Sequence, residues 1–303
     1  MGSRDQVRIA DVDQALLGGF RDYVKAFGVL HDDSYIMSED LVVYDPLFEP
    51  SVVALDGSGG IVGAASVMID GYAGQGLARF RILHAADPEI YPRLLGEVTP
   101  KLPPSVRTVF LFLPEDAGPV EPALEDAGFG VSRRAYILKH ADPGVVPRIG
   151  PPSDTVLTQA LPSAANDWTN IVNLAFAGQP GRYEMTPDRA RDSLARDRVI
   201  REGTIMAWRG GVPVGVVITV FDHDLTRAGE IETLAVTPAN QGVGLGSALL
   251  RTALVAAADR GCTVVTLSVS AANRRALALY LDAGFTVADV RVCWEAHLGG
   301  IAG

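Results

Sequence analysis

The chain has 303 residues, about twice a typical domain length, so two domains are expected. Hydrophobic residues make up 48% and charged residues 20%, which is typical of a globular protein with real cores. The net charge of −10 argues against a nucleic-acid partner, because no basic surplus exists to neutralise phosphates. The acidity fits a cationic or amine substrate, or it simply keeps the protein in solution.

The cysteines and histidines indicate the compartment of the protein and whether it has a metal site. The two cysteines, Cys262 and Cys293, have no CxxC spacing, which argues against a disulfide framework and fits a reducing compartment. No stretch resembles a signal peptide or is long enough to span a bilayer. The histidines show no HxxxH or HxH grouping (His31, His84, His140, His223, His297). We therefore expect a cytoplasmic protein without a metal site and without a membrane partner.

A segment rich in proline and glycine divides the chain. We predict a domain at residues 1–140, a linker at 141–153 and a second domain at 154–303. Two segments of the first half resemble two of the second in the same order: 124–129 (LEDAGF) resembles 280–285 (YLDAGF), and 61–67 resembles 213–219. This repeat predicts a duplication in which both halves share one α/β fold.

The second half has the clearer pattern of strands and helices. Thr186 is a candidate N-cap with Pro187 at the first helical position, and Gly210-Gly211-Val212 indicates a hairpin turn. In chain order we predict a strand at 155–160, a helix at 162–176, a helix from 187, strands at 204–209, 213–221 and 229–236, a helix at 247–260, a strand at 264–269 and a helix at 273–283.

A glycine-rich turn between the strand at 229–236 and the next helix indicates an anion site. Glycines let the backbone approach a ligand, and the first amides of a helix have no internal partners. A P-loop would need a lysine after the glycines, and a dinucleotide fingerprint would need glycine where Ser247 stands. The remaining alternatives are a different pyrophosphate ligand or glycines that merely turn the chain.

At these residues the sequence resembles the GCN5-related N-acetyltransferase (GNAT) family. The family pattern [QR]xxGx[GA] is matched by 241–246 (QGVGLG), and the pattern NxxAxxLY is matched by 273–280. The resemblance is close in the second half and degenerate in the first. It implies α/β (α+β) architecture with two tandem GNAT-like domains, each a mixed, mostly antiparallel sheet flanked by helices. The tandem layout resembles that of the mycothiol synthase-like members.

The resemblance also implies acetyl-CoA as cofactor and assigns roles to individual residues. Asn273 would anchor the cofactor arm, and Tyr280 would protonate the departing thiolate; the alternative for Tyr280 is a core aromatic. Backbone groups would bind the pantetheine arm at Leu234, Ala235 and Val236. Backbone amides would bind the pyrophosphate at Gln241, Gly242, Val243, Gly244, Leu245 and Gly246.

Glu230 and Glu232 are the candidates for the general base, because they alternate on one face of the strand that leads to the glycine turn. The resemblance favours Glu230, with Glu232 as the alternative, and either could instead be a solvated strand carboxylate. Cys262 has no neighbouring group in sequence to activate it, so direct transfer in a ternary complex is favoured over a covalent route.

We therefore predict transfer of an acetyl group to a primary amine of a small molecule or peptide. The alternative is a non-catalytic acetyl-CoA sensor, which would need neither Glu230 nor Tyr280. In the first half Tyr280 corresponds to Leu124 and Asn273 to Ala117, so that half is expected to be non-catalytic. Residues 168–183, the helix from Pro187 and the first half are expected to shape the acceptor site. The oligomeric state stays open.

Overall fold

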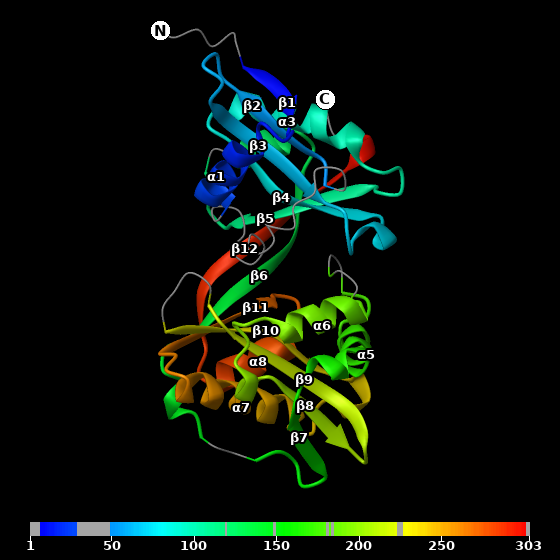
Figure 1. Ribbon diagram of the computed structural model, residues 1–303, viewed down its shortest axis with the longest axis vertical. Coiled ribbons are helices and arrows are strands. Elements are labelled where there is room, and N and C mark those ends of the chain that lie inside the picture. The colour runs from blue at the N-terminus through cyan, green and yellow to red at the C-terminus, as the bar shows by residue number, and fades with distance from the viewer. Residues whose placement is uncertain are drawn as a thin grey trace. The chain divides into compact units, whose positions relative to one another are not determined.

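The computed structural model describes residues 7–28, 49–118, 120–147, 150–179, 182, 185–222 and 227–300. His31 and His223, which were named above, and Tyr183, which ends the segment 168–183, lie outside the described residues. The chain forms two compact units, one of residues 1–134 with 290–303 and one of residues 135–289. The predicted fold class is confirmed, since each unit has a mixed, mostly antiparallel sheet flanked by helices (Figure 1).

The first unit has β1 to β5 as neighbours in chain order, followed by the second part of β12. Only the pair β4–β5 among these is parallel. Its elements are β1 (Arg8–Asp11), α1 (Leu17–Phe27), β2 (Ser51–Leu55), β3 (Ile61–Met68), β4 (Leu77–Ala85), α3 (Tyr91–Val98), β5 (Thr108–Pro114) and α4 (Val120–Asp126), with short 3-10 helices at Ala73–Gln75, Pro88–Ile90 and Thr99–Lys101. Strand β6 (Gly130–His140) begins in this unit, and β12 (Thr286–His297) and a 3-10 helix (Leu298–Gly300) end in it.

The second unit has the strand order β6-β11-β10-β9-β8-β7, and β10–β11 is its parallel pair. Its elements are β7 (Thr155–Gln159), α5 (Ala165–Ala175), α6 (Pro187–Ala195), β8 (Ile205–Arg209), β9 (Val212–Phe221), β10 (Ala228–Val236), α7 (Leu245–Asp259), β11 (Val264–Ser270) and α8 (Arg274–Asp282), with 3-10 helices at Pro143–Val145, Pro162–Ala164, Arg201–Gly203 and Pro238–Asn240. Thr186 caps α6 as predicted, its hydroxyl accepting from Arg189 N at 3.3 Å. Within the described ranges, no helix has the length and apolar character needed to cross a membrane.

Side chains of β9 supply two cores, one on each face of the second unit's sheet. Val214 and Val217 pack in the core that includes α7, whereas Val216 and Ile218 pack in the core that includes α5 and α6. Helices therefore cover both faces of this sheet, with α7 and α8 on one face and α5 and α6 on the other (Figure 1). A strand buried on both faces needs a nearly continuous apolar sequence, which β9 has.

The two units exchange their last strands, so their bounds differ from the expected 1–140, 141–153 and 154–303. Residues 135–140 of β6 pair with β11 in the second unit, and residues 291–297 of β12 pair with β5 in the first. Val146 of the expected linker is buried in the core of the second unit. Sequence patterns could not reveal the exchange, because a strand carries the same alternation whichever partner it joins.

Strand register shows that the two units repeat one design. In β5–β12 the pair is Val109 with Ala296, and in β11–β6 it is Val265 with His140, so one offset of 156 residues relates both pairs. The parallel strand pair of each unit ends at an equivalent residue pair, which is Arg79–Phe110 in the first unit and Glu230–Thr266 in the second. Strand β4 also has one extra residue, Arg81, where β10 has Glu232.

The strand exchange predicts that Trp294→Ala destabilises the first unit although this residue lies near the C-terminal end of the sequence. Trp294 is 5% exposed and, with Val292 and Ala296 of the same strand, packs in a core whose other buried members lie within residues 52–129, so truncation should cost about 3–5 kcal/mol. Urea unfolding followed by circular dichroism measures the loss. Val287→Ala is the control on the same strand, because Val287 is 48% exposed and should change stability by less than about 0.5 kcal/mol. Equal losses for both variants would contradict the exchange.

Candidate functional site

A cavity of about 320 Å³ lies in the second unit where β10 and β11 diverge. The parallel pairing of these strands covers only 228–230 with 264–266. Beyond that point residues 231–236 of β10 and 268–270 of β11 line the cavity instead. Its remaining walls come from the glycine turn, from α8 and from the segment that follows α5. The end of the parallel ladder therefore creates the opening in the sheet.

A β-bulge in β10 shapes the wall nearest the two glutamates. Ile231 pairs with Thr219 and Thr233 pairs with Ile218, so Glu232 is the extra residue of the bulge. A bulge interrupts the regular alternation of side chains along a strand. Glu232 consequently lines the cavity and Glu230 does not, which differs from the simple alternation that the sequence pattern suggested.

The glycine turn 241–246 presents its backbone to the cavity. Gly242 and Gly244 have φ of 84° and 87°, a left-handed conformation that favours glycine. Gly244 is the N-cap of α7, so the first amides of that helix have no partners within the helix. Gln241, Gly242, Gly244, Gly246 and Ser247 line the cavity.

Two members of the turn that were expected to bind the ligand are not among the residues that line the cavity. Val243 is exposed to solvent, and the side chain of Leu245 is buried in the core under α7; neither is among the cavity-lining residues. The buried Leu245 anchors the start of the helix, so its contribution to a ligand could come only through its backbone.

Arg275 lies against the glycine turn, and sequence reasoning missed it. Its Nη1 donates to Gln241 Oε1 at 3.1 Å, while Gln241 Nε2 donates to the carbonyl oxygen of Val236 at 3.0 Å. A Cβ on Gly242 would stand 2.7 Å from Arg275 Nη2. The guanidinium therefore places a positive charge beside free helix amides, and both favour an anion. Its position within the matched motif at 273–280 was the signal that could have found it.

Asn273 and Tyr280, the two expected side chains of α8, both line the cavity. Asn273 is the N-cap of α8, its Oδ1 accepting from Ala276 N at 3.1 Å. Tyr280 is 7% exposed and packs edge-on against Phe285, with 5.9 Å between ring centroids. Burial raises the pKa of Tyr280 to about 12, against a smaller opposing effect of Arg182. The phenol is therefore protonated at neutral pH and able to donate.

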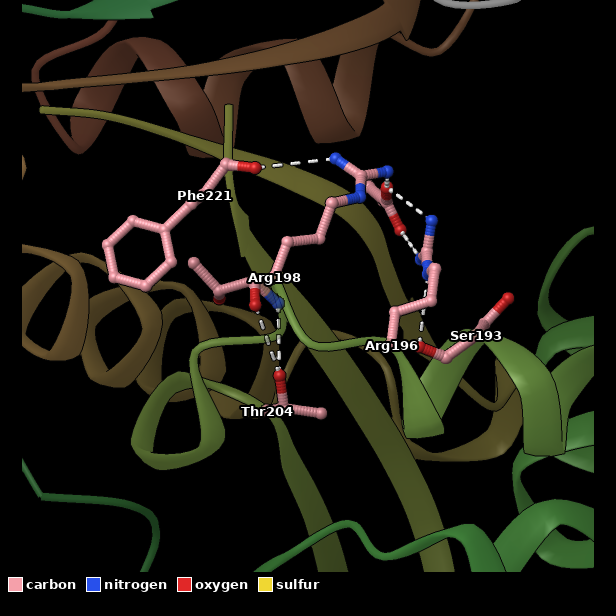
Figure 2. Close-up of polar contacts among 7 residues, drawn as sticks. Ser193, Arg196, Arg198, Thr204 and Phe221 are labelled. Carbon is pink, nitrogen blue, oxygen red and sulfur yellow. Dashed lines mark hydrogen bonds and ion pairs between the residues drawn. The ribbon is translucent and has the colours of Figure 1, made fainter. Parts of the chain in front are cut away.

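Glu232 is held by two arginines that sequence reasoning did not identify. Arg196 Nη1 donates to Glu232 Oε1 at 3.1 Å, Arg196 Nη2 donates to Oε2, and Arg198 Nη2 donates to Oε1. Figure 2 shows the two guanidinium groups turned toward one carboxylate. Cationic donors thus occupy both oxygens of this carboxylate.

Glu230 has the opposite environment. Burial and repulsion by the Glu232 carboxylate raise the pKa of Glu230 to about 7, and Asp222 adds to this rise. Arg198 and Arg196 oppose the rise. A carboxyl group that titrates near neutral pH has the property of a general base.

The corresponding positions of the first unit carry different chemistry. Register places Arg79 and Arg81 where the second unit has Glu230 and Glu232. Arg79 is buried against Phe112, with 5.2 Å from its Cζ to the ring centroid. The turn after β4 contains a 3-10 helix and no glycine at 86–90. Leu124 occupies the position that is equivalent to Tyr280. The first unit thus has neither carboxylate, phenol nor glycine turn at these places.

Of the described aromatic residues in the segment 168–183, one lies in the core and one lines the cavity. Trp168 is 1% exposed in the core formed with α5 and α6, so it is a core residue. Phe176 lines the cavity, and Arg182 stacks over its ring with 3.4 Å from Cζ to the centroid. Among the described residues no group of three or more His, Cys, Asp or Glu is arranged to hold a metal ion.

The family model "Acetyltransferase (GNAT) family" matches residues 167–285, which lie within the second unit. A mycothiol acetyltransferase of Catenulispora acidiphila is 32% identical over 168 residues, 54% of each chain. The chain thus spans about half the length of the curated relatives that it first matches. A mycothiol acetyltransferase of Thermobispora bispora is 29% identical over 82% of this chain and 89% of its own.

A solved structure, a tandem GNAT protein from the clavulanic acid biosynthesis pathway, has a similar fold. It has a TM-score of 0.69 and covers 97% of this chain and 99% of its own at 15% identity. At that identity the likeness concerns the fold alone. It agrees with the two repeated units described above.

The two glutamates should respond oppositely when their charge is removed. The raised pKa of Glu230 means that the folded state binds its proton more tightly than the unfolded state, so stability falls as pH rises from about 4.5 through about 7. Glu230→Gln should therefore stabilise the protein by about 1–3 kcal/mol at pH 8 and by much less at pH 5. Glu232→Gln should destabilise it by about 1–3 kcal/mol at pH 8, because two arginines lose their partner. Urea unfolding at both pH values tests this, and a loss of stability in Glu230→Gln at pH 8 would contradict it.

Proposed function

We propose that the chain is an acetyl-CoA-dependent N-acetyltransferase of the GNAT family, with two such folds in tandem, and that its site is the cavity of the second unit. The observation that carries the proposal is that one cavity combines a glycine turn, free helix amides and a protonated tyrosine. Binding alone would need the turn, whereas acyl transfer also needs the tyrosine and a base.

The residues of the glycine turn fit the diphosphate of acetyl-CoA. Left-handed Gly242 and Gly244 expose their backbone, the amides at the start of α7 carry no internal hydrogen bonds, and Arg275 adds a cation. Residues 234–236 of β10 line the cavity beyond the parallel ladder, so their backbone groups suit the amide-containing pantetheine arm. Asn273 lines the same wall and supports the proposed role as anchor. Acetyl-CoA would supply an activated acetyl group as a thioester.

Glu230 is the better of the two candidates for the base. Glu232 is bound by two arginines, whereas the pKa of Glu230 is raised to about 7. An ionised Glu230 would accept a proton from the acceptor ammonium, so that the neutral amine attacks the acetyl carbonyl. Since Glu230 is not among the residues that line the cavity, we place one water between it and the amine.

Tyr280 is the proposed acid. Its phenol stays protonated at neutral pH and would give its proton to the sulfur as the carbon–sulfur bond breaks. Attack and departure take place in one ternary complex, and no acyl group is carried by the protein. Cys262 is buried and its pKa is raised by burial, so it is a poor nucleophile.

The acceptor class follows from the relatives and from the walls of the cavity. The matched curated proteins are named mycothiol acetyltransferases, which supports a small-molecule amine as acceptor. Phe176 and Arg182, at the end of the cavity near α5, are the side chains most suited to contact it. A non-catalytic acetyl-CoA sensor is the second candidate, and it would need neither the perturbed Glu230 nor Tyr280.

Acetyl-CoA should bind saturably at one site, whereas NADH and ATP should not. Gly242→Ala should weaken this binding about tenfold or more, because a methyl group is strained at φ of 84° and meets Arg275. Gly211→Ala is the matched control, since Gly211 has φ of 78° in the hairpin turn with no atom within 4 Å of its Cβ position. Isothermal titration calorimetry measures all three proteins. No binding to the parent would overturn the proposed function.

Tyr280→Phe should reduce kcat about 10²-fold while the affinity for acetyl-CoA stays within about twofold, because only the proton donor is lost. The rate is measured as thiol release in the presence of a panel of small primary amines. Phe285→Leu is the control for the packing of the ring, since Phe285 contacts Tyr280 and carries no proton. Unchanged turnover in Tyr280→Phe would remove Tyr280 as the acid.

A further inference from the structure

The bulge residue Glu232 is fixed by a cluster with Arg196 and Arg198, here called the bulge clamp. Arg196 binds both carboxylate oxygens and Arg198 binds one, with the three side chains 10–20% exposed. Each arginine is also oriented by the backbone: Arg196 Nε donates to the carbonyl of Ser193 at 3.2 Å, and Arg198 Nη1 donates to that of Phe221 at 3.4 Å (Figure 2). The guanidinium planes are thus set by more than Glu232 itself.

The segment that carries these arginines is held on β9. Phe221 N donates to the carbonyl of Arg198 at 2.8 Å, and Ile200 N donates to that of Thr219, also at 2.8 Å. Val199 and Val220 form an antiparallel bridge. Because Val220 pairs on its other side with Glu230, the arginine segment, β9 and β10 lie in register across this part of the sheet. The bulge clamp therefore couples the end of α6 to the strand of the proposed base.

Glu230 lies within the field of this cluster. The charged groups that act on it are Glu232 on its own strand, Arg196 and Arg198 on the segment after α6, and Asp222 after β9. On its parallel neighbour β11 it pairs with Thr266, which carries no charge. Glu232 and Asp222 disfavour ionisation of Glu230, and both arginines favour it. Burial raises the pKa of Glu230 most, and the clamp's members act on this pKa in opposite directions.

The first unit contains the same bulge with its charges reversed. Its extra residue is Arg81, which Glu49 binds through Oε2 at 3.1 Å from Nε and at 2.6 Å from Nη2. An ion pair at the bulge is therefore compatible with either polarity as far as the fold is concerned. Only the second unit has a carboxylate there, next to a second glutamate.

We propose that Arg196, Arg198 and Glu232 are positioning residues for Glu230: the clamp fixes the bulge of β10, removes Glu232 from proton transfer and sets the pH range in which Glu230 is ionised. The inference rests on the proposed function for the role of Glu230 as base. Its electrostatic part can be measured on the protein alone, without an acceptor.

The test is a pH titration of side-chain carboxyl carbons by NMR on protein with ¹³C-labelled glutamate. The Glu230 signal is assigned by its disappearance in Glu230→Gln. The parent should titrate with a midpoint of about 7. Glu232→Gln should lower this midpoint by about one unit, because the repelling charge is gone and the arginines are released. Arg198→Gln should raise it by about one unit, because the attraction is lost.

Three further proteins separate this from a general effect of mutation. Arg198→Lys keeps the charge and should keep the midpoint within about 0.3 units of the parent. The Glu230 midpoint of the double variant Arg198→Gln/Glu232→Gln should lie between the midpoints of the two single variants. Arg260→Gln removes an exposed arginine that pairs with Glu202, and it should leave the midpoint unchanged. Shifts of the same sign, or no shift, in Glu232→Gln and Arg198→Gln would overturn the proposal. If Arg198→Gln does not fold, the test rests on Glu232→Gln alone, in which the Glu230 midpoint must fall for the proposal to stand.

Activity distinguishes failure of this inference from failure of the proposed function. The rate of thiol release should follow the NMR midpoint of each variant, and Glu230→Gln should lose about 10²-fold or more in kcat. If the Glu230 midpoint shifts in opposite directions in Glu232→Gln and Arg198→Gln but Glu230→Gln is fully active, the electrostatic coupling is retained and Glu230 is not the base. If the midpoint does not shift in these two variants but Glu230→Gln is inactive, Glu230 is retained as the base and the role of the clamp is overturned.

Discussion

The site depends on the point at which the parallel ladder of β10 and β11 stops. Pairing ends at Glu230 and Thr266, so the backbone groups farther along β10 are left to line a cavity. Buried backbone groups need hydrogen-bond partners, and an extended ligand with amide groups can supply them. The bulge at Glu232 follows directly, and Glu232 is among the residues that line the cavity. The glycine turn at the end of the same strand completes the opening.

The duplicated chain shows which features belong to the fold and which to the chemistry. Both units end their parallel ladder at equivalent residues, and both have a bulge whose extra residue forms an ion pair. The two units therefore share the divergence of the strands and a paired charge at the bulge. The identities differ: Arg79 and Arg81 replace Glu230 and Glu232, and Leu124 replaces Tyr280. The first unit keeps the framework and lacks the groups that we propose to transfer protons in the second.

Local patterns allowed much of the fold and part of the candidate site to be predicted. The helix of Leu245–Asp259, the cap at Thr186, the hairpin at Gly210-Gly211 and the turn 241–246 follow from periodicity, capping and glycine chemistry, which act within a few residues. Arg275, Arg196 and Arg198 were missed because their contacts are with residues 33 to 36 positions away, and a surface arginine has the same local pattern as an arginine beside a site.

The sequence by itself determined the family resemblance, the duplication and the residues of the glycine turn, because motif spacing and backbone conformation are local properties. Only the tertiary structure decided which unit receives β6 and β12, since strand alternation does not name a partner. Only the tertiary structure distinguishes Glu230 from Glu232. The two carboxylates have the same intrinsic chemistry, and they differ through burial and through two arginines brought across β9, which are long-range effects.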